Sequence, residues 1–222
     1  MPNRQAPLAH LKTYLPEGTD ETILQWLVHY KVHLTITRPR KTILGDYRHR
    51  THYSNHRISV NGNLDIYSFL ITLVHELAHL LVFEQYHQPP GSRGVAAHGR
   101  EWQKIYAGLL SAFLNKNIFP AEIENELKQT LRKPAANSCA EDDLVRVLRK
   151  YDKKLTLVNE AASSQHKLVE EIPTGGKFRL PDGRIFQRGE KLRKRFKCVE
   201  VGTRKVYLFS PVHEVVEMSR ES

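Results

Sequence analysis

The chain has 222 residues, of which 40% are hydrophobic and 26% charged, and a formal net charge of +10 at pH 7. This length suits one main domain with a small appendage, and the composition is ordinary for a soluble globular protein. The two cysteines, Cys139 and Cys198, lack a C-x-x-C partner, which excludes a disulfide framework and a cysteine-based zinc site. The basic balance favours anionic partners, with nucleic acid first among them.

The amino terminus, MPNRQAPLAHLKTYL, has no apolar segment of the kind found in secretory signals, so we expect a cytoplasmic location. The most apolar stretch, residues 66–85, is nearly long enough to span a membrane. Three ionisable groups at its middle, His75, Glu76 and His79, would each be costly in lipid. We therefore expect no membrane partner.

The first quarter of the chain predicts a helix followed by a small antiparallel sheet. Apolar residues recur at helical spacing over residues 19–30, and β-branched runs predict strands at residues 33–38, 41–47 and 56–60. The Gly45-Asp46 pair and the polar run 48–55 are expected to form a turn and a loop between these strands. An edge strand of such a sheet can hold an extended peptide by main-chain pairing.

The polar loop carries three histidines, His49, His52 and His56, together with several arginines. A second metal site is conceivable there, but the spacing fits no strong ligand template and the loop holds no carboxylate. The favoured interpretation is an exposed basic loop. A functional variant of that interpretation is a loop that contacts a phosphate backbone.

The centre of the chain carries an H-E-x-x-H match, from His75 through Glu76 to His79, inside the apolar run. On a helix, residues four apart share one face, so the two imidazoles can hold one Zn²⁺ with the Glu76 carboxylate beside it as a general base. Polar groups this deep in an apolar helix are costly unless they are paired or bound to a metal. We therefore expect a metal-binding helix here.

A catalytic zinc needs three protein ligands and one open position. His98 is the best third candidate, because the loop at residues 86–97 can return the start of the next helix to the metal. Glu84 and Glu101 are rival candidates. Glu84 lies five residues after His79 on the same helix and points about 140° away from it, which disfavours Glu84.

Four segments together resemble the SprT-like family, the metalloprotease-like group that includes the eukaryotic DNA–protein crosslink protease Spartan. They are the LGDY turn at residues 44–47, RISVN at 57–61, HELAH at 75–79 and HGREW at 98–102. The resemblance covers residues 17–115, about half the chain. It implies a zincin-like domain with His75, His79 and His98 as zinc ligands and Glu76 as the catalytic acid/base.

The second half of the chain predicts two amphipathic helices, at residues 119–131 and 141–151, and then a linker. The helices are separated by a break at residues 133–137, and Ser138 is expected to cap the second one. The proposed division is therefore a metallopeptidase-like domain at residues 1–157, a linker at 158–174 and a β module at 175–222.

The last segment changes to a period of two, which predicts one hairpin around residues 181–183 and a second around Gly202. SprT-like proteins often end in a cysteine-based zinc ribbon, but here Cys198 alone stands where such a ribbon has four cysteines. We therefore expect a ribbon-like, all-β module without metal. The fold class is α+β.

The terminal module is the most basic part of the chain. Residues 177–205 hold eleven Lys/Arg against three acids. Alternation predicts Arg193, Arg195 and Lys197 on one strand face and Leu192, Phe196 and Cys198 on the other. That cationic face suits phosphates, with Phe186, Phe196 or Tyr207 available for stacking if exposed. A solvated edge strand whose charges prevent aggregation explains the pattern equally well.

Two functions of different classes follow from the sequence. The first is a zinc-dependent metallopeptidase in which Glu76 is the general base on a zinc-bound water and the protein substrate is associated with DNA or other nucleic acid. The second is a nucleic-acid-associated binding protein whose zinc is structural or vestigial, for which the resemblance to the SprT-like family implies a role in transcription or a stress response. A hydrolase acting on other bonds is a third, less favoured reading.

Overall fold

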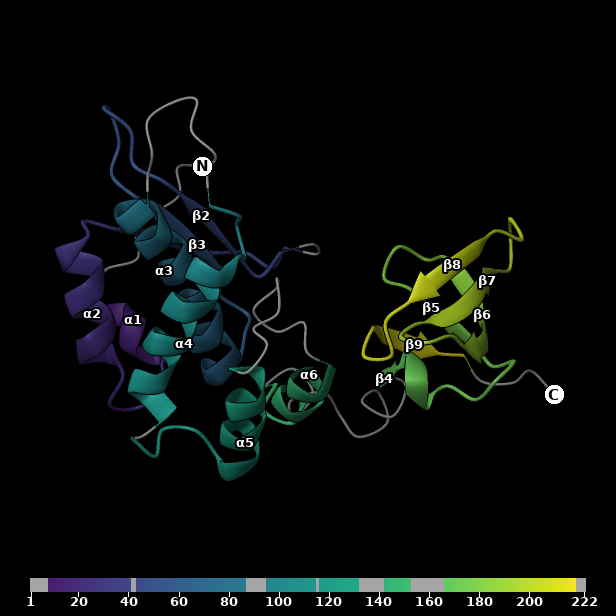
Figure 1. Ribbon diagram of the computed structural model, residues 1–222. Coiled ribbons are helices and arrows are strands. Elements are labelled where there is room, and N and C mark those ends of the chain that lie inside the picture. Colours follow the sequence, from purple (N-terminus) through teal and green to yellow (C-terminus); the bar gives the residue numbers. More distant parts are fainter. Residues whose placement is uncertain are drawn as a thin grey trace. The chain divides into compact units, whose positions relative to one another are not determined.

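The computed structural model describes residues 8–40, 43–86, 95–114, 116–131, 142–152 and 166–218. The chain divides into two compact units, Met1–Asp152 and Lys153–Ser222, which are drawn in purple to green and in green to yellow (Figure 1). The first unit combines helices with a small sheet, and the second is built on a larger antiparallel sheet. The predicted α+β class is therefore confirmed.

The first unit begins with α1 (Leu8–Leu11), the 3₁₀ turn η1 (Lys12–Tyr14) and α2 (Asp20–His29). Helix α2 matches the prediction because two of its apolar residues, Ile23 and Leu27, fall one turn apart and are fully buried in the core.

The sheet of the first unit holds β1 (His33–Thr37), β2 (Gly45–Arg48) and β3 (Arg57–Asn61) in the order β1-β3-β2. Strand β2 is antiparallel to β3, but β1 is parallel to β3, so the prediction of a purely antiparallel sheet is wrong. The reason is that the chain does not continue from β1 into the neighbouring strand of the sheet. It first forms the edge strand β2. The chain then returns through the loop before β3 into the middle of the sheet.

The predicted turn at Gly45-Asp46 is also wrong, because both residues belong to β2. Glycine followed by aspartate is a common turn signal, but Gly45 is needed here for a different reason. A Cβ atom at this position would lie 2.5 Å from Oε1 of Glu76. The absent side chain lets the strand lie directly against helix α3.

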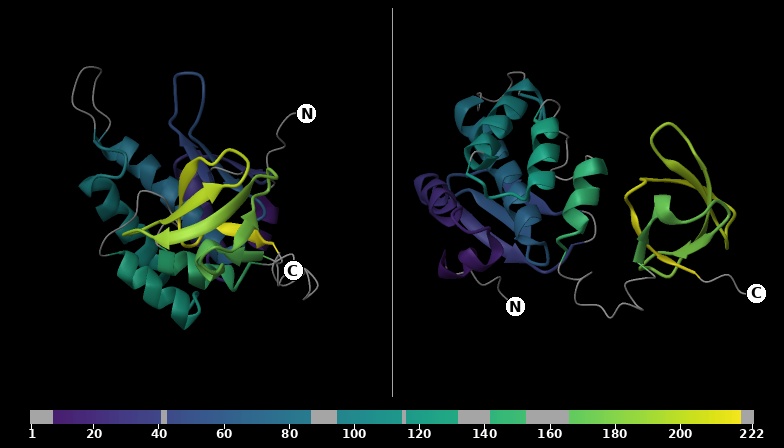
Figure 2. Two further views of the ribbon diagram at one scale, coloured as in Figure 1. Left: turned by 90° about the vertical axis from the view of Figure 1, so that its right-hand side faces the viewer. Right: turned by 90° about the horizontal axis from the view of Figure 1, so that it is seen from below.

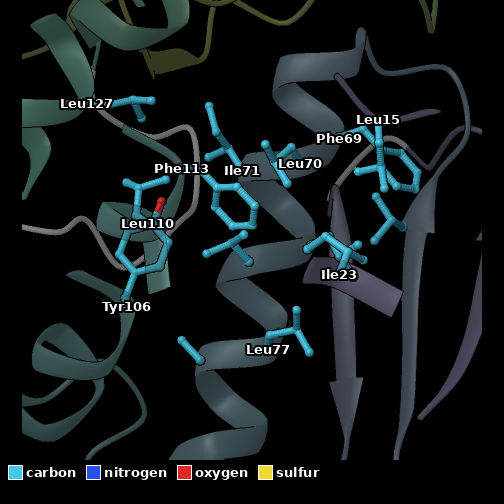
Figure 3. Packing of buried hydrophobic residues seen from close by; sticks show 14 of the residues in the cluster. Leu15, Ile23, Phe69, Leu70, Ile71, Leu77, Tyr106, Leu110, Phe113 and Leu127 are labelled. Carbon is cyan, nitrogen blue, oxygen red and sulfur yellow. The ribbon is translucent and has the colours of Figure 1, made fainter. Parts of the chain in front are cut away.

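Helix α3 (Ile66–Tyr86) is the core of the first unit (Figure 3). One side of α3 packs against α4, where Tyr106 and Phe113 lie. Its other side faces α2 and the sheet, where Leu15 and Ile23 lie. Full burial of each such aliphatic side chain contributes roughly 1.5–3 kcal/mol. By length and composition α3 could cross a membrane, but 67% of its apolar window is buried inside the protein.

Three more helices complete the first unit: α4 (Arg100–Leu114), α5 (Ala121–Thr130) and α6 (Asp142–Arg149). All three were predicted, with ends that differ by a few residues. Trp102, the first buried residue of α4, is also the first of the predicted core stripe. The predicted break at residues 133–137, Ser138 and Cys139 lie outside the described residues, as do residues 87–94 of the predicted loop.

The second unit is a six-stranded antiparallel sheet in the order β4-β9-β5-β6-β7-β8, and Figure 2 shows it curling round its buried side. Its elements are β4 (His166–Leu168), the 3₁₀ turn η2 (Val169–Glu171), β5 (Lys177–Arg179), β6 (Ile185–Lys191), β7 (Phe196–Glu200), β8 (Val206–Phe209) and β9 (Glu214–Glu217). The core cluster includes Phe178, Phe186 and Phe209.

Both predicted hairpins are present, but the ribbon-like description is wrong, because β4 and β9 extend the sheet beyond two hairpins. The prediction that residues 158–174 form a linker is also wrong for the carboxyl-terminal half of that segment. Residues 166–168 form β4, and Val169 and Ile172 are buried in the core of the second unit. Their periodicity is weak because the segment changes from a strand to a 3₁₀ turn within six residues.

Candidate metal centre

Three imidazoles meet where α3 faces the start of α4. Nε2 of His79 lies 3.2 Å from Nε2 of His75. Nε2 of His98 lies 3.3 Å from Nε2 of His75 and 3.1 Å from Nε2 of His79. The helical spacing of four brings the first two together, and residues 96–99 return His98 to them through the hydrogen bond from Gly99 N to Ala96 O. These three residues form a group that could hold a metal ion. His98 therefore lies close enough to His75 and His79 to share a metal ion with them.

The separations fit the donor set of a tetrahedral ion. A tetrahedral site with metal–nitrogen bonds of about 2.0–2.1 Å places its ligand nitrogens roughly 3.3–3.4 Å apart. The three observed separations of 3.1–3.3 Å lie close to that value. Three neutral imidazoles cannot satisfy one another at a common point, whereas a cation accepts all three lone pairs. The residues present therefore fit a metal ion.

Burial keeps these imidazoles neutral, which is the form that binds metal. Removal from water, with the neighbouring histidines adding to it, lowers the pKa of His75 to about 3. The same causes lower the pKa of His79 to about 4, and burial also lowers the pKa of His98. The His75 ring is enclosed by Trp102, whose centroid is 4.7 Å away. Its Nδ1 has no hydrogen-bond partner within the described part of the chain.

Glu76 lies on the same helix and is 7% exposed. Burial, with a smaller contribution from the Asp46 carboxylate, raises the pKa of Glu76 to about 8, and the Arg40 guanidinium opposes the shift. Its carboxylate occupies the space that the missing side chain of Gly45 leaves. Glu76 therefore lies between helix α3 and the edge strand β2, and its carboxyl has a raised pKa.

Two residues on one face of strand β2, Gly45 and Tyr47, contact residues of the H-E-x-x-H segment. Gly45 meets Glu76, and two residues further on the Tyr47 ring lies parallel to the His79 ring, with 6.5 Å between centroids and 5° between planes. Burial, with the Glu84 carboxylate adding to it, raises the pKa of Tyr47, so its hydroxyl stays protonated. That hydroxyl lies 2.9 Å from Nδ1 of His56.

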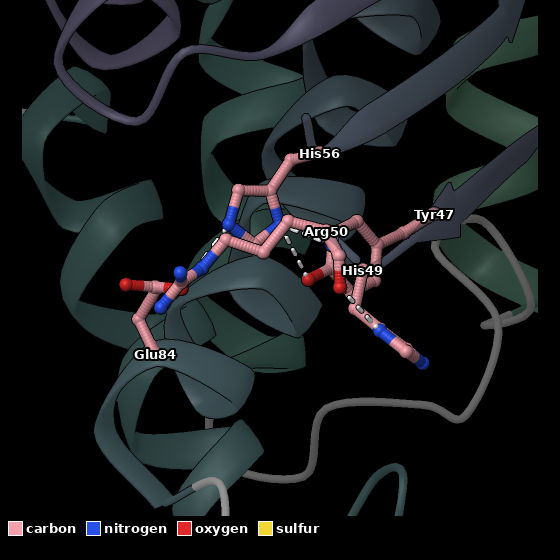
Figure 4. Close-up of polar contacts among 5 residues, drawn as sticks. All are labelled: Tyr47, His49, Arg50, His56 and Glu84. Carbon is pink, nitrogen blue, oxygen red and sulfur yellow. Dashed lines mark hydrogen bonds and ion pairs between the residues drawn. The ribbon is translucent and has the colours of Figure 1, made fainter. Parts of the chain in front are cut away.

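A polar network attaches the loop before β3 to the end of α3 (Figure 4). The Arg50 backbone N–H can only donate, so Nδ1 of His56, 3.3 Å away, must accept and Nε2 must carry the ring proton. Nε2 then donates to Oε1 of Glu84 at 3.1 Å, and the Arg50 side chain pairs with the same oxygen at 2.8 Å.

The prediction of an exposed basic loop is confirmed for residues 48–55, which are exposed apart from the partly buried Ser54, but the network makes His56 an exception. His56 is 2% exposed and its buried ring is fully hydrogen-bonded, while His49 stacks on Phe83 and His52 is exposed. The three histidines do not converge on a second metal site among the described residues. Residues 28 apart in the chain form the central contact, so no local spacing in the sequence could have indicated it.

The two rival ligands take other places. Glu84 is engaged by Arg50 and His56 and does not belong to the histidine group. Glu101, in the first turn of α4, is likewise not a member of that group. The angular argument against Glu84 is therefore consistent with the structure.

The predicted cationic face of the terminal module is wrong in its geometry. Arg193 and Arg195 lie in the turn between β6 and β7, which is closed by the hydrogen bond from Leu192 N to Arg195 O, and only Lys197 lies on a strand. All three cationic side chains are exposed, and Leu192 is 43% exposed instead of facing the core. The turn contains no Gly, Pro, Asn or Asp, so its sequence looked like a continuing strand.

The stacking role considered for two aromatic residues is also excluded. Phe186 and Phe196 are 0% and 3% exposed, because both fill the core of the sheet. The Arg188 guanidinium carbon lies 4.0 Å from the centroid of the Phe196 ring and covers that face. Tyr207 is partly exposed, and Cys198 is a buried free thiol.

No protein-family model matches the chain, and neither the curated proteins nor the solved structures contain a significant match to it.

Proposed function

We propose that this chain is a zinc-dependent metallopeptidase of the SprT-like type, acting on proteins that are associated with nucleic acid or crosslinked to it. The observation that carries the proposal is the meeting of three Nε2 atoms within 3.3 Å of one another beside a buried Glu76 on the same helix. Three imidazole nitrogens at a tetrahedral spacing suit Zn²⁺. This donor set leaves a coordination position for water.

The surroundings of the histidines support a zincin-like domain. Strand β2 is the edge of its sheet, and its contacts with Glu76 and His79 place it alongside the site helix. An edge strand has main-chain groups free to pair with an extended peptide. A substrate paired with β2 would therefore pass next to both residues.

Within this proposal His75, His79 and His98 would hold a zinc ion, which would supply a Lewis acid for the scissile carbonyl and lower the pKa of a bound water. Glu76 accepts a proton from the attacking water and later donates it to the leaving amine. Burial raises the pKa of this carboxyl to about 8, and a nearby divalent cation would lower it again and so favour the carboxylate that accepts the proton. Tyr47 packs parallel to His79 and restricts the orientation of that ring.

The nucleic-acid part of the proposal is based on the second unit. Residues 177–205 hold eleven Lys/Arg against three acids, and Arg193, Arg195 and Lys197 are exposed at the β6–β7 turn and on β7. Exposed cations without a base-reading arrangement contact phosphates in a sequence-tolerant, salt-dependent way. The same exposed cations favour the second candidate, a nucleic-acid-binding protein whose metal is structural or vestigial.

The deciding experiment is metal analysis combined with a proteolysis assay, with and without DNA, on the wild type and on Glu76→Gln. We expect both proteins to bind one zinc and only the wild type to cleave. Glu124→Gln, the same substitution at a partly exposed residue of α5, serves as the matched control and keeps its activity. Undiminished cleavage by Glu76→Gln contradicts the peptidase proposal, and a metal-loaded wild type that binds DNA without any cleavage favours the second candidate.

A further inference from the structure

A cavity of about 250 Å³ lies on the three-stranded sheet, and none of the three grouped histidines lines it. Ile58 and Val60 of β3 are buried in the core, so the alternate residues Arg57 and Ser59 project from the opposite face of the sheet. The cavity is lined by three arginines and three residues with hydroxyl side chains: Arg40, Arg48, Arg57, Thr35, Thr37 and Ser59.

Two of the arginines are neighbours across strands. Arg48 of β2 and Arg57 of β3 are directly opposite in the antiparallel register, and His33 of β1 occupies the same row. Like charges directly opposite in a sheet destabilise it unless something compensates them. Arg48 also pairs with Asp46 at 3.0 Å, whereas Arg57 has no ion pair with any residue that the structure describes.

The third arginine is held in place by neutral groups. Nε of Arg40 donates to Oδ1 of the buried Asn61 at 2.8 Å, and Nη1 donates to Oγ of Ser59 at 3.0 Å. Because Oγ of Ser59 accepts this bond, its own O–H remains able to donate towards the cavity. The guanidinium charge of Arg40 is thus fixed at the rim without a carboxylate partner among its hydrogen bonds.

The lining has a net charge of +2, because Asp46 is the one acid among the lining residues and faces three arginines. Fixed guanidinium groups with adjacent hydroxyl donors match the oxygens of a phosphate. A volume near 250 Å³ is several times the roughly 30 Å³ that one water occupies in the liquid, so it can also take a group esterified to the phosphate.

We propose that this cavity is a phosphate-binding site, in which Arg40, Arg48 and Arg57 and the hydroxyl of Ser59 bind a phosphate ester. The phosphate can come from the backbone of a nucleic acid or from a free phosphorylated molecule. The site requires neither a metal ion nor peptidase activity, so it stands or fails separately from the function proposed above.

The test uses the full chain stripped of metal with a chelator, so that the histidine group cannot capture phosphate. Inorganic phosphate is titrated while the arginine Nε–H and backbone amide resonances are followed, and a labelled single-stranded oligonucleotide is titrated by fluorescence anisotropy at several salt concentrations. The test variant is Arg48→Gln with Arg57→Gln. Its matched control, Arg38→Gln with Arg100→Gln, removes two exposed arginines that do not line the cavity.

We expect phosphate to shift the Arg40, Arg57 and Ser59 resonances in a saturable way, and we expect these shifts in the control but not in the test variant. If nucleic acid is the source, the test variant also reduces the slope of log affinity against log salt by about 1.4, or roughly 0.7 for each lost contact. Saturable shifts without this change of slope assign the site to free phosphate esters.

The proposal is overturned if phosphate causes no saturable shifts and the test variant binds the oligonucleotide with an unchanged salt dependence, and also if the control variant shows an equal loss. Ser59→Ala removes one hydroxyl without changing the charge, so it tests the site even if the double arginine variant does not fold. We expect it to weaken phosphate binding several-fold, and unchanged phosphate binding by Ser59→Ala contradicts the assigned role of that hydroxyl. Thermal unfolding in phosphate-free buffer establishes that each variant is folded.

Discussion

Nε2 of His56 lies 3.1 Å from Oε1 of Glu84, so a residue just before β3 is hydrogen-bonded to the last turn of α3. The same ring accepts at Nδ1 from the Tyr47 hydroxyl, and Tyr47 packs parallel to His79. The contact therefore connects the edge strand beside the histidine group to the helix that carries His75 and His79. We therefore expect the contact between His56 and Glu84 to stabilise the fold and to hold Tyr47 against the His79 ring.

Glu84→Ala is expected to lower the free energy of unfolding by about 1–3 kcal/mol, because it leaves the buried His56 ring without its acceptor. Glu84→Gln retains an acceptor oxygen and should cost less. Urea denaturation of the metal-free protein measures both. Glu124→Ala is the control, since it removes an i,i+4 pair with the exposed Lys128, and such a surface pair contributes only a few tenths of a kcal/mol. Equal losses for Glu84→Ala and Glu124→Ala would show that the network is not stabilising.

Acidification should weaken the fold through His56. Burial lowers its pKa in the folded protein below the ordinary 6.5. Between these two values the unfolded chain binds the proton more readily, so stability decreases as the pH falls through about 6.5. Glu84, whose pKa is also lowered in the folded protein, loses its contribution only further down, below its ordinary value of 4.5.

Urea unfolding between pH 8 and pH 5 tests this dependence on the wild type and on His56→Gln. The variant should show a shallower loss of stability across the range, because it lacks the group whose protonation drives part of that loss. The other buried histidines contribute equally to both proteins, so the difference between the curves isolates His56. Parallel curves would contradict the assignment.

Gly45→Ala is expected to cost about 1–3 kcal/mol of stability and to reduce proteolysis, because the new methyl group would lie 2.5 Å from Oε1 of Glu76 and must displace it. Zinc stoichiometry should be unchanged, since no histidine is touched. Gly108→Ala in α4 is the matched control. Its Cβ meets nothing within 4 Å, so it should stabilise the protein by about 0.5–1 kcal/mol. Normal activity of Gly45→Ala would separate the position of Glu76 from catalysis.

His98→Ala should reduce zinc affinity by more than the roughly 10–100-fold that follows loss of a residue supporting a ligand. Competition with a chromophoric chelator measures it. In the wild type, zinc at a hundred times its dissociation constant should add about 2.7 kcal/mol to the free energy of unfolding, and this gain should largely disappear in the variant. The exposed His52→Ala is the control. Unchanged affinity in His98→Ala would leave the metal on two histidines and contradict the three-ligand site.

Local periodicity in the sequence was sufficient to predict the site helix. Apolar residues over residues 66–85 and histidines four apart determine that His75 and His79 share a face, because the pitch of the helix is fixed by the backbone. That His98 would lie near these two histidines was predictable from its position at the start of the next helix. The hairpin joining β5 and β6 was predictable in the same way, since Gly183 adopts the positive φ of 88° that such a turn requires.

Tertiary structure alone decided the surroundings of those residues. The sequence predicts a turn at Gly45, but Gly45 is a strand residue that pairs with Val60. A glycine is needed there because the carboxylate of Glu76 occupies the space that a side chain would take. His56 reads as an exposed histidine, but it is buried because Glu84 and Tyr47 converge on it from distant segments. Spacing along the chain determines which side chains share a helix face or strand. Contacts between residues tens of positions apart depend on how helices and strands pack, and no local pattern contains that information.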